Sequence, residues 1–172
     1  LVFGAAEYAK DGLAPWFEWT GPGPWLDRMQ ALVRGVWDGV ETGLPSDDVE
    51  VLGDLLQVCA RLHWWTGDER YAHWTLRLAD AFLQGERDLL QGEKLALRDH
   101  GCEVIGGLAE AYVLAAHRDP ARREAYRPRL HALLDRILEA GRDERGLLFD
   151  AFDPRSGARV GAGWSDGFGY VY

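Results

Sequence analysis

Apolar residues recur along three stretches of the chain at the spacing of an amphipathic α-helix, in which residues three, four and seven positions apart share a face. The pattern predicts helices at 26–41, 69–84 and 122–140. Each has one apolar stripe opposite a charged face, and the clearest stripe consists of Leu130, Leu133, Leu134, Ile137 and Leu138. Because a helix with a single apolar stripe lies on the outside of a fold, we expect these helices to form an outer layer.

A second kind of helix is predicted before each of these three. The segments 3–16, 49–64 and 103–117 carry apolar or small residues on most faces, which is typical of a buried helix. Each pairs with the outer helix that follows it, so the chain divides into three inner–outer helical hairpins. Residues 168–172 begin a fourth inner helix in this interpretation. The predicted fold class is therefore all-α.

Two internal repeats support the hairpin as the repeating unit. The turn WTGPGPW at 19–25 recurs as WTGDERY at 65–71, 46 positions later. The segment VEVLG at 49–53 recurs as CEVIG at 102–106, 53 positions later. These periods are longer than the units of about 34 residues that are typical of open helical-repeat scaffolds.

Two long connections, 85–98 and 141–165, join an outer helix to the next inner one. Connections of this length in a helical protein are functional or disordered. The second contains four large apolar residues, so we expect it to pack against the helices; they are Leu147, Leu148, Phe149 and Phe152. Five tryptophans at repeated positions or on apolar stripes are predicted to lie in the core, namely Trp19, Trp25, Trp37, Trp65 and Trp74.

The WTG-x-x-x-[WY] turns, the EV-[LI]-G helix starts and the segment GWSDGFGY at 163–170 together resemble the six-hairpin (α/α) toroid of the glycosidase-like superfamily. That superfamily includes glycoside hydrolases, unsaturated uronyl hydrolases, sugar epimerases and some polysaccharide lyases. The resemblance implies a ring of inner helices wrapped by outer ones, with a carbohydrate substrate. Three hairpins amount to about half of such a ring, so we expect residues 1–172 to form one partial domain that packs against the remainder of its own domain.

Composition excludes several other classes. The chain has 28 acidic and 19 basic residues and a net charge of −9, which argues against a nucleic-acid-binding surface. No apolar run reaches the length of a membrane span. Cys59 and Cys102 give neither a disulfide framework nor zinc-ribbon spacing. We expect no metal, no cofactor, no nucleic acid and no membrane partner, and the sequence leaves the cellular localisation open.

Candidate chemistry gathers at the predicted starts of the inner helices. Parallel inner helices bring their N-terminal ends to one mouth, where unpaired N–H groups favour polar or anionic ligands. Aligned starts place oxygen-bearing residues first and Glu or Tyr four positions later: Ser46, Asp99 and Asp166, then Glu50, Glu103 and Tyr170. The first set can cap the helices, and Asp99 and Asp166 can also transfer protons, because glycoside hydrolysis uses two carboxylates about 5–9.5 Å apart.

Two further residues belong to the same predicted mouth. His100 precedes an inner helix and could act as a base or contact a ligand, although a surface position without function is the alternative. Trp164 could stack on a sugar ring or pack within its loop. Asp150 and Asp153 are weaker candidates. His100 and Cys102 lack a third ligand at suitable spacing, which disfavours a zinc toroid like the peptide cyclases.

The sequence thus predicts part of a carbohydrate-processing toroid that is similar to glycoside hydrolases. Its candidate catalytic residues are Asp99, Asp166 and His100, and its candidate substrate-binding residues are Trp164, Glu103 and Tyr170. A polysaccharide lyase or sugar epimerase would depend more on His100 and Tyr170. A non-catalytic helical-repeat scaffold is the competing class, because a fold alone does not fix a reaction.

Overall fold

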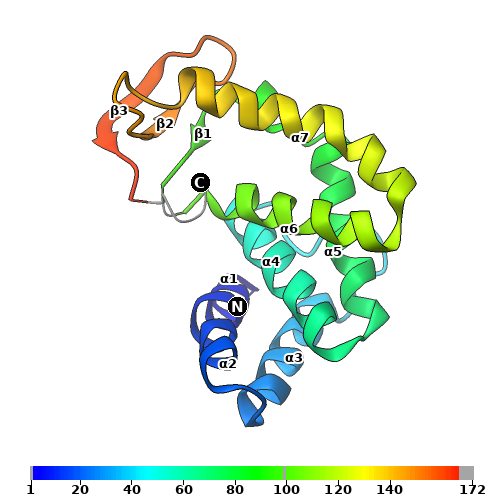
Figure 1. Ribbon diagram of the computed structural model, residues 1–172. Helices are drawn as coiled ribbons and strands as arrows, with labels where there is room; N and C mark the ends of the chain where they lie inside the picture. The colour runs from blue at the N-terminus through cyan, green and yellow to red at the C-terminus, as the bar shows by residue number, and fades with distance from the viewer. Residues whose placement is uncertain (1, 99, 167–172) are drawn as a thin grey trace.

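The protein is mainly helical and carries one small sheet at an end of its last helix, as the computed structural model in Figure 1 shows for residues 2–98 and 100–166. The helical elements are α1 (Val2–Glu7), the π-helical η1 (Tyr8–Leu13), α2 (Ala14–Thr20), α3 (Pro24–Trp37), α4 (Val49–Thr66), α5 (Glu69–Leu83), the 3-10 turn η2 (Leu89–Gln91), α6 (Glu103–Arg118) and α7 (Pro120–Ala140). The predicted inner and outer helices are all present, with ends within a few residues of the expected positions. The predicted fourth inner helix lies outside the described residues.

The first inner helix is longer than predicted. α1, η1 and α2 follow one another without a break, so helical backbone runs from residue 2 to residue 20. It ends where Gly21 adopts a φ of 80°, a left-handed conformation that a side chain disfavours. The π-helical segment in its middle is a rare conformation that is frequent at functional sites, and it carries the buried Lys10.

The inner helices α4 and α6 run in parallel and approach each other closely at two glycines. A methyl group on Gly53 would lie 2.4 Å from the backbone nitrogen of Val104, and one on Gly107 would lie 2.6 Å from Cβ of Leu56. No side chain could occupy either position without moving the helices apart. The EV-[LI]-G repeat of the sequence therefore includes a packing glycine in its first copy, Gly53.

Each outer helix packs against the inner helix before it, α5 on α4 and α7 on α6. Tight turns join the helices of these two hairpins, and the first lies in the segment 65–71 that the sequence predicts as a turn. Gly67 ends α4 in the left-handed conformation, with φ 70°, and Asp68 caps α5 by accepting a hydrogen bond from the Arg70 N–H at 3.0 Å. Asp119 caps α7 in the same way, through the N–H of Arg122 at 3.0 Å.

The all-α prediction is wrong in one respect, because the two long connections pair to form a three-stranded antiparallel sheet. β1 (Leu95–Ala96) pairs with β2 (Phe149–Phe152), and β2 pairs with β3 (Arg159–Trp164). In register, Leu95 lies opposite Phe152 and Phe149 lies opposite Trp164. The predicted packing of the second connection is confirmed for Leu148 and Phe152, both fully buried.

Of the five tryptophans predicted to lie in the core, Trp37 is buried, three are half-buried against the core, and one is exposed. Trp37 of α3 and Trp74 of α5 stack with centroids 5.2 Å apart, and they join the two outer helices. Trp19, however, is 80% exposed. It lies in the last turn of α2, which the sequence did not predict, and its ring contacts Trp16 edge-on rather than the core. Across the described part of the chain, no helix is both long and apolar enough to span a membrane.

Candidate functional site

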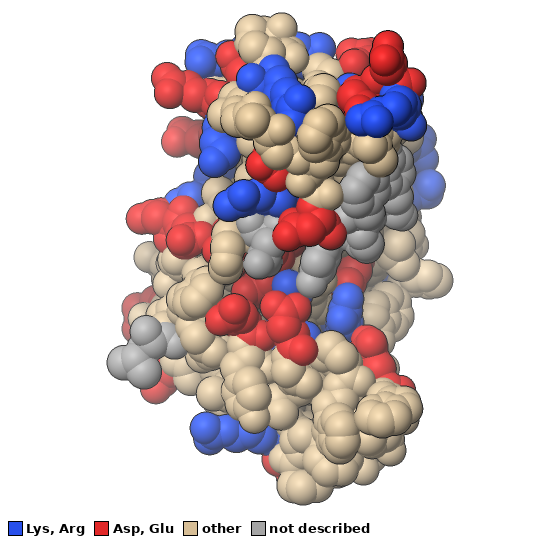
Figure 2. Space-filling view, turned by 90° about the vertical axis from the view of Figure 1, so that its left-hand side faces the viewer, with Lys and Arg blue, Asp and Glu red and all other residues tan. Residues whose placement is uncertain are grey.

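A polar pocket lies between the sheet and the beginning of α6. Its volume is about 340 Å³, within the lower part of the range of about 300–1,000 Å³ for small-molecule sites. It is lined by residues of all three strands and of the segment before α6, namely Lys94, Ala96, Arg98, His100, Asp150, Ala151, Val160 and Gly161. Figure 2 looks onto the side of the molecule that carries the sheet, where charged side chains of both signs lie across the middle.

His100 and Glu50 meet at the edge of this pocket. Nδ1 of His100 lies 2.5 Å from Oε1 of Glu50, so the first turn of α4 contacts the segment that leads into α6. The histidine side chain is 58% exposed, and that of Glu50 is 13% exposed. A carboxylate on Nδ1 fixes the orientation of the imidazole ring.

The backbone around His100 is held in an uncommon conformation. His100 has a φ of 63°, in the left-handed region that few residues other than glycine adopt. The next residue, Gly101, lies so close to β1 that a methyl group on it would be 2.5 Å from Cβ of Ala96. Its N–H donates to Oε2 of Glu103 at 2.7 Å. Such strain is found at functional sites, where the surrounding structure maintains it.

Glu103 is placed differently from the predicted substrate-binding role. It is the first residue of α6 and is 2% exposed, so its carboxylate holds the Gly101 backbone rather than facing the pocket. Its own carbonyl accepts a hydrogen bond from Nε2 of Gln57 on α4 at 2.8 Å. Glu103 thus positions the segment that carries His100.

The opposite side of the pocket contains Asp150 of β2 and Arg98. Oδ2 of Asp150 lies 3.8 Å from a terminal nitrogen of Arg98, which is an ion pair without a close hydrogen bond. Gly163 of β3 makes room for this carboxylate, since a methyl group there would be 2.1 Å from Oδ2. Asp150 was only a weaker candidate from the sequence, because its pairing with β1 and β3 could not be foreseen. Asp153 forms the expected turn, accepting from the Arg155 N–H at 2.8 Å.

A stripe of polar residues runs along α4 below Glu50, and we call it the polar seam. The four positions share one helix face, at spacings of four, three and four residues: Glu50, Asp54, Gln57 and Arg61. Each contacts a neighbouring inner helix or the segment before it. Arg61, for example, donates to Glu110 of α6 at 2.8 Å. The high apolar content of α4 predicts a buried helix and hides the seam, although the spacing of the four polar residues is visible in the sequence.

Asp54 and Lys10 form a buried ion pair in the middle of the seam. Nζ of Lys10 lies 3.1 Å from Oδ1 of Asp54 and 2.9 Å from Oδ1 of Asp11. Burial raises the pKa of Asp54 to about 7, even though Lys10 acts in the opposite direction. Burial alone would lower the pKa of Lys10, but the two carboxylates raise it above its ordinary value. The pair joins the π-helical segment to α4.

The remaining predicted catalytic residues lie at the margin of the described structure. Asp99 and Tyr170 fall outside the described residues. The expectation that Asp99 shares a helical face with Glu103 therefore stays a prediction; α6 begins at Glu103, and Cys102 is its cap position. Asp166 is exposed and follows β3.

The predicted cap at Ser46 is also wrong. α4 begins at Val49, and its cap is Asp48, whose Oδ1 accepts from the Glu50 N–H at 2.9 Å. Ser46 lies two residues earlier, and its hydroxyl accepts from the N–H of Asp48 at 3.1 Å. The alignment of the helix starts was therefore shifted by two residues at this helix.

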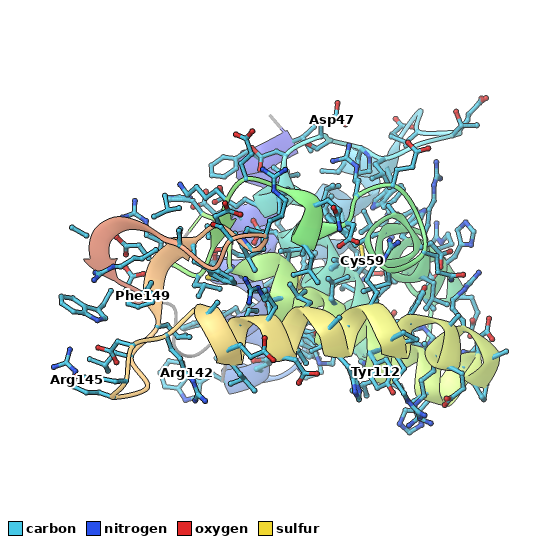
Figure 3. All side chains as sticks on the ribbon, turned by 90° about the horizontal axis from the view of Figure 1, so that it is seen from above. Asp47, Cys59, Tyr112, Arg142, Arg145 and Phe149 are labelled. Carbon is cyan, nitrogen blue, oxygen red and sulfur yellow. The ribbon has the colours of Figure 1, made fainter. Side chains whose placement is uncertain are left out.

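Trp164 is exposed, as its predicted role requires, but its ring already has charged neighbours. The guanidinium carbon of Arg159 lies 4.7 Å from the ring centroid, that of Arg145 lies 5.7 Å away, and Nε1 donates to Asp143 at 3.3 Å. Figure 3 shows Arg145 and Phe149 together at the end of the molecule that carries the sheet. Trp164 is not among the described residues that line the pocket.

Asp143 holds this cluster together. Partial desolvation acts to raise its pKa, but hydrogen bonds from the Arg145 side chain, from two backbone N–H groups and from Trp164 lower it to about 2. The carboxylate is therefore charged at neutral pH and keeps the indole and the guanidinium of Arg145 in place. Stacking of a sugar on Trp164 would have to compete with these arginines.

Neither metal-binding groups nor comparison with known proteins assigns a function to this site. Within residues 2–98 and 100–166, no group of three or more His, Cys, Asp or Glu side chains is arranged to hold a metal ion. Cys59 and Cys102 are both buried, and neither forms a disulfide bond within the described residues; burial raises the pKa of the Cys59 thiol. No known protein-family model matches the chain, and no curated protein matches it significantly in sequence.

Proposed function

We propose that this chain is part of a carbohydrate-processing (α/α) toroid whose site is the pocket between the sheet and the beginning of α6. The observation that carries the proposal is the contact of His100 with Glu50 at the edge of this pocket. It joins the starts of two parallel inner helices.

The pocket offers the chemistry that a sugar needs. Its lysine, arginine and histidine donate hydrogen bonds, and Asp150 accepts them, so hydroxyl groups can be bound from both sides. Glycoside hydrolysis remains the leading reaction class, with Asp99 and Asp166 as the carboxylates. His100 would then orient the sugar or exchange a proton with it.

A second reaction class is favoured by the geometry of His100. An imidazole that is oriented by a carboxylate is suited to removing a proton from carbon, which is the step that polysaccharide lyases and sugar epimerases share. In this case Nε2 of His100 would accept the proton, and Glu50 would stabilise the resulting imidazolium. Tyr170 would be the expected acid.

The proposal is tested by turnover of a defined panel of neutral and acidic oligosaccharides, with hydrolysis followed by new reducing ends and elimination by ultraviolet absorbance. His100→Gln is expected to lower turnover at least about 100-fold, the usual contribution of a general acid or base. The melting temperature should change little, because His100 is exposed. Asp166→Asn should reduce hydrolysis alone.

The control is Lys94→Gln, which changes a pocket residue that has no proposed role in proton transfer. It should alter the KM more than kcat. Failure of every sugar to bind or react would leave the non-catalytic scaffold as the better interpretation. A large loss of stability in Asp166→Asn, with turnover retained, would limit that residue to helix capping.

A further inference from the structure

The pocket is unusual in the balance of its charges. The whole chain carries 28 acidic and 19 basic residues. Among the described lining residues this excess is reversed, because Lys94 and Arg98 are permanently charged cations and Asp150 is the only carboxylate. A cationic cavity in an acidic protein favours an anionic ligand and repels other acidic surfaces.

The two permanent cations of the pocket are also poorly paired. Arg98 has only the 3.8 Å contact with Asp150, and the described residues provide no ion pair or side-chain hydrogen bond for Lys94. Several other surface arginines are engaged. Arg136, for example, donates to the carbonyl oxygens of Pro154 and Arg155, and Arg129 donates to those of Phe82 and Gly85. Lys94 and Arg98 therefore keep donors available at the cavity.

These cations are placed so that one bound group could reach both. Lys94 and Arg98 flank the two residues of β1, and successive side chains of a strand alternate between its faces. Lys94, Ala96 and Arg98 therefore share the face that lines the pocket, with the small Ala96 between them. An oxyanion above Ala96 would receive the planar donors of Arg98 on one side and the ammonium of Lys94 on the other.

We propose that the pocket recognises an oxyanion on a sugar, either the carboxylate of a uronate or a sulfate ester, through Lys94 and Arg98. This inference rests on the proposed carbohydrate function and narrows its substrate class. Asp150 accepts hydrogen bonds from hydroxyl groups of the same sugar. His100 lies beside the bound ring, where its Nε2 can contact the substituents next to the anionic group.

The experiment measures binding of matched methyl glycosides to the 172-residue chain by isothermal titration calorimetry. The ligands are methyl glucuronide, methyl glucoside, methyl glucoside 6-sulfate and inorganic sulfate. We expect the glucuronide or the sulfated glucoside to bind at least about tenfold more tightly than the neutral glucoside, a difference that corresponds to about 1.4 kcal/mol. The stronger of the two identifies the oxyanion.

Three variants locate the binding. Arg98→Gln and Lys94→Gln should each remove most of the preference for the anionic glycoside. Arg28→Gln is the matched control, because Arg28 is an exposed arginine of α3 that does not line this pocket. It removes the same charge and should leave the preference unchanged.

The outcomes separate this inference from the proposed function. Equal binding of the neutral and anionic glycosides would overturn the inference and leave the carbohydrate site standing. Binding of inorganic sulfate as tightly as of the glycosides would show a simple anion site and overturn the inference. No binding of any sugar would remove the proposed function as well. If Arg28→Gln reduced the preference for the anionic glycoside as much as Arg98→Gln and Lys94→Gln do, the preference would come from general charge attraction. That result would contradict the role of the pocket.

Discussion

The close approach of α4 and α6 at Gly53 can be tested by adding one methyl group. In Gly53→Ala the new Cβ would lie 2.4 Å from the backbone nitrogen of Val104 and 2.7 Å from the carbonyl carbon of Glu103. Both obstructing atoms belong to the backbone of a helix, so no rotamer change can relieve the contact. The two helices must separate, and the neighbouring core must repack.

The expected change in the free energy of unfolding of Gly53→Ala follows from two opposing effects. Overpacking of a core costs about 1–3 kcal/mol, and a backbone obstruction places Gly53→Ala near the upper end. Alanine recovers about 1 kcal/mol through its higher helix propensity. The expected net loss is about 2 kcal/mol, which lowers the urea midpoint by about 1 M for a denaturant slope of about 2 kcal/mol/M.

The control is a helical glycine that no atom crowds. Gly35 lies inside α3, and nothing comes within 4 Å of a Cβ built on it. Gly35→Ala should therefore raise the free energy of unfolding by up to about 1 kcal/mol. Urea denaturation followed by circular dichroism compares the two variants. If Gly53→Ala were as stable as the unmodified chain, or gained stability as Gly35→Ala does, the described packing of α4 on α6 would be refuted.

Three further results are expected. Asp54 binds its proton more tightly when folded, with a pKa of about 7 against 3.8 for the ordinary group, so the free energy of unfolding should fall as the pH rises from about 4 to about 7. Asp54→Asn should weaken this dependence of the free energy of unfolding on pH, measured by urea titrations at several pH values. An unchanged dependence would contradict its assignment to Asp54. Asp48→Ala should lower the free energy of unfolding by about 1 kcal/mol, because α4 loses its cap, whereas Ser46→Ala should lower it by less than about 0.5 kcal/mol. Equal losses in the two variants would instead indicate that Ser46 is the cap. Trp19→Gln should leave the melting temperature unchanged, because the ring is 80% exposed, and a large loss of stability would show that it is buried in solution.

The helices could be predicted because each of them repeats its pattern over three or more turns. Periodicity and turn chemistry located the hairpin tips at Gly67 and Asp119. α2 continues to Thr20, beyond the predicted end at Trp16, and Pro15 is compatible with its first turn. Local signals are reliable where one segment determines its own structure.

The pocket could not be predicted in the same way, because it depends on contacts between distant segments. β1 has two residues, too few for a recognisable alternation, and its partner Phe152 lies in another connection. Glu50 was visible in the alignment of helix starts, but only the three-dimensional structure brings it to His100. The polar seam left a periodic signal in α4 that the high apolar content of this helix obscured.

The pairing of Leu95 with Phe152 closes a chain loop that contains the whole α6–α7 hairpin. Bringing such distant residues together costs entropy that a two-residue strand cannot offset by itself. The β1–β2 pairing is therefore expected to form after α6 and α7 have packed against each other. The walls of the pocket that the sheet supplies would then form late in folding. A chain halted before that step would hold native-like helices and yet lack any recognition surface for its ligand.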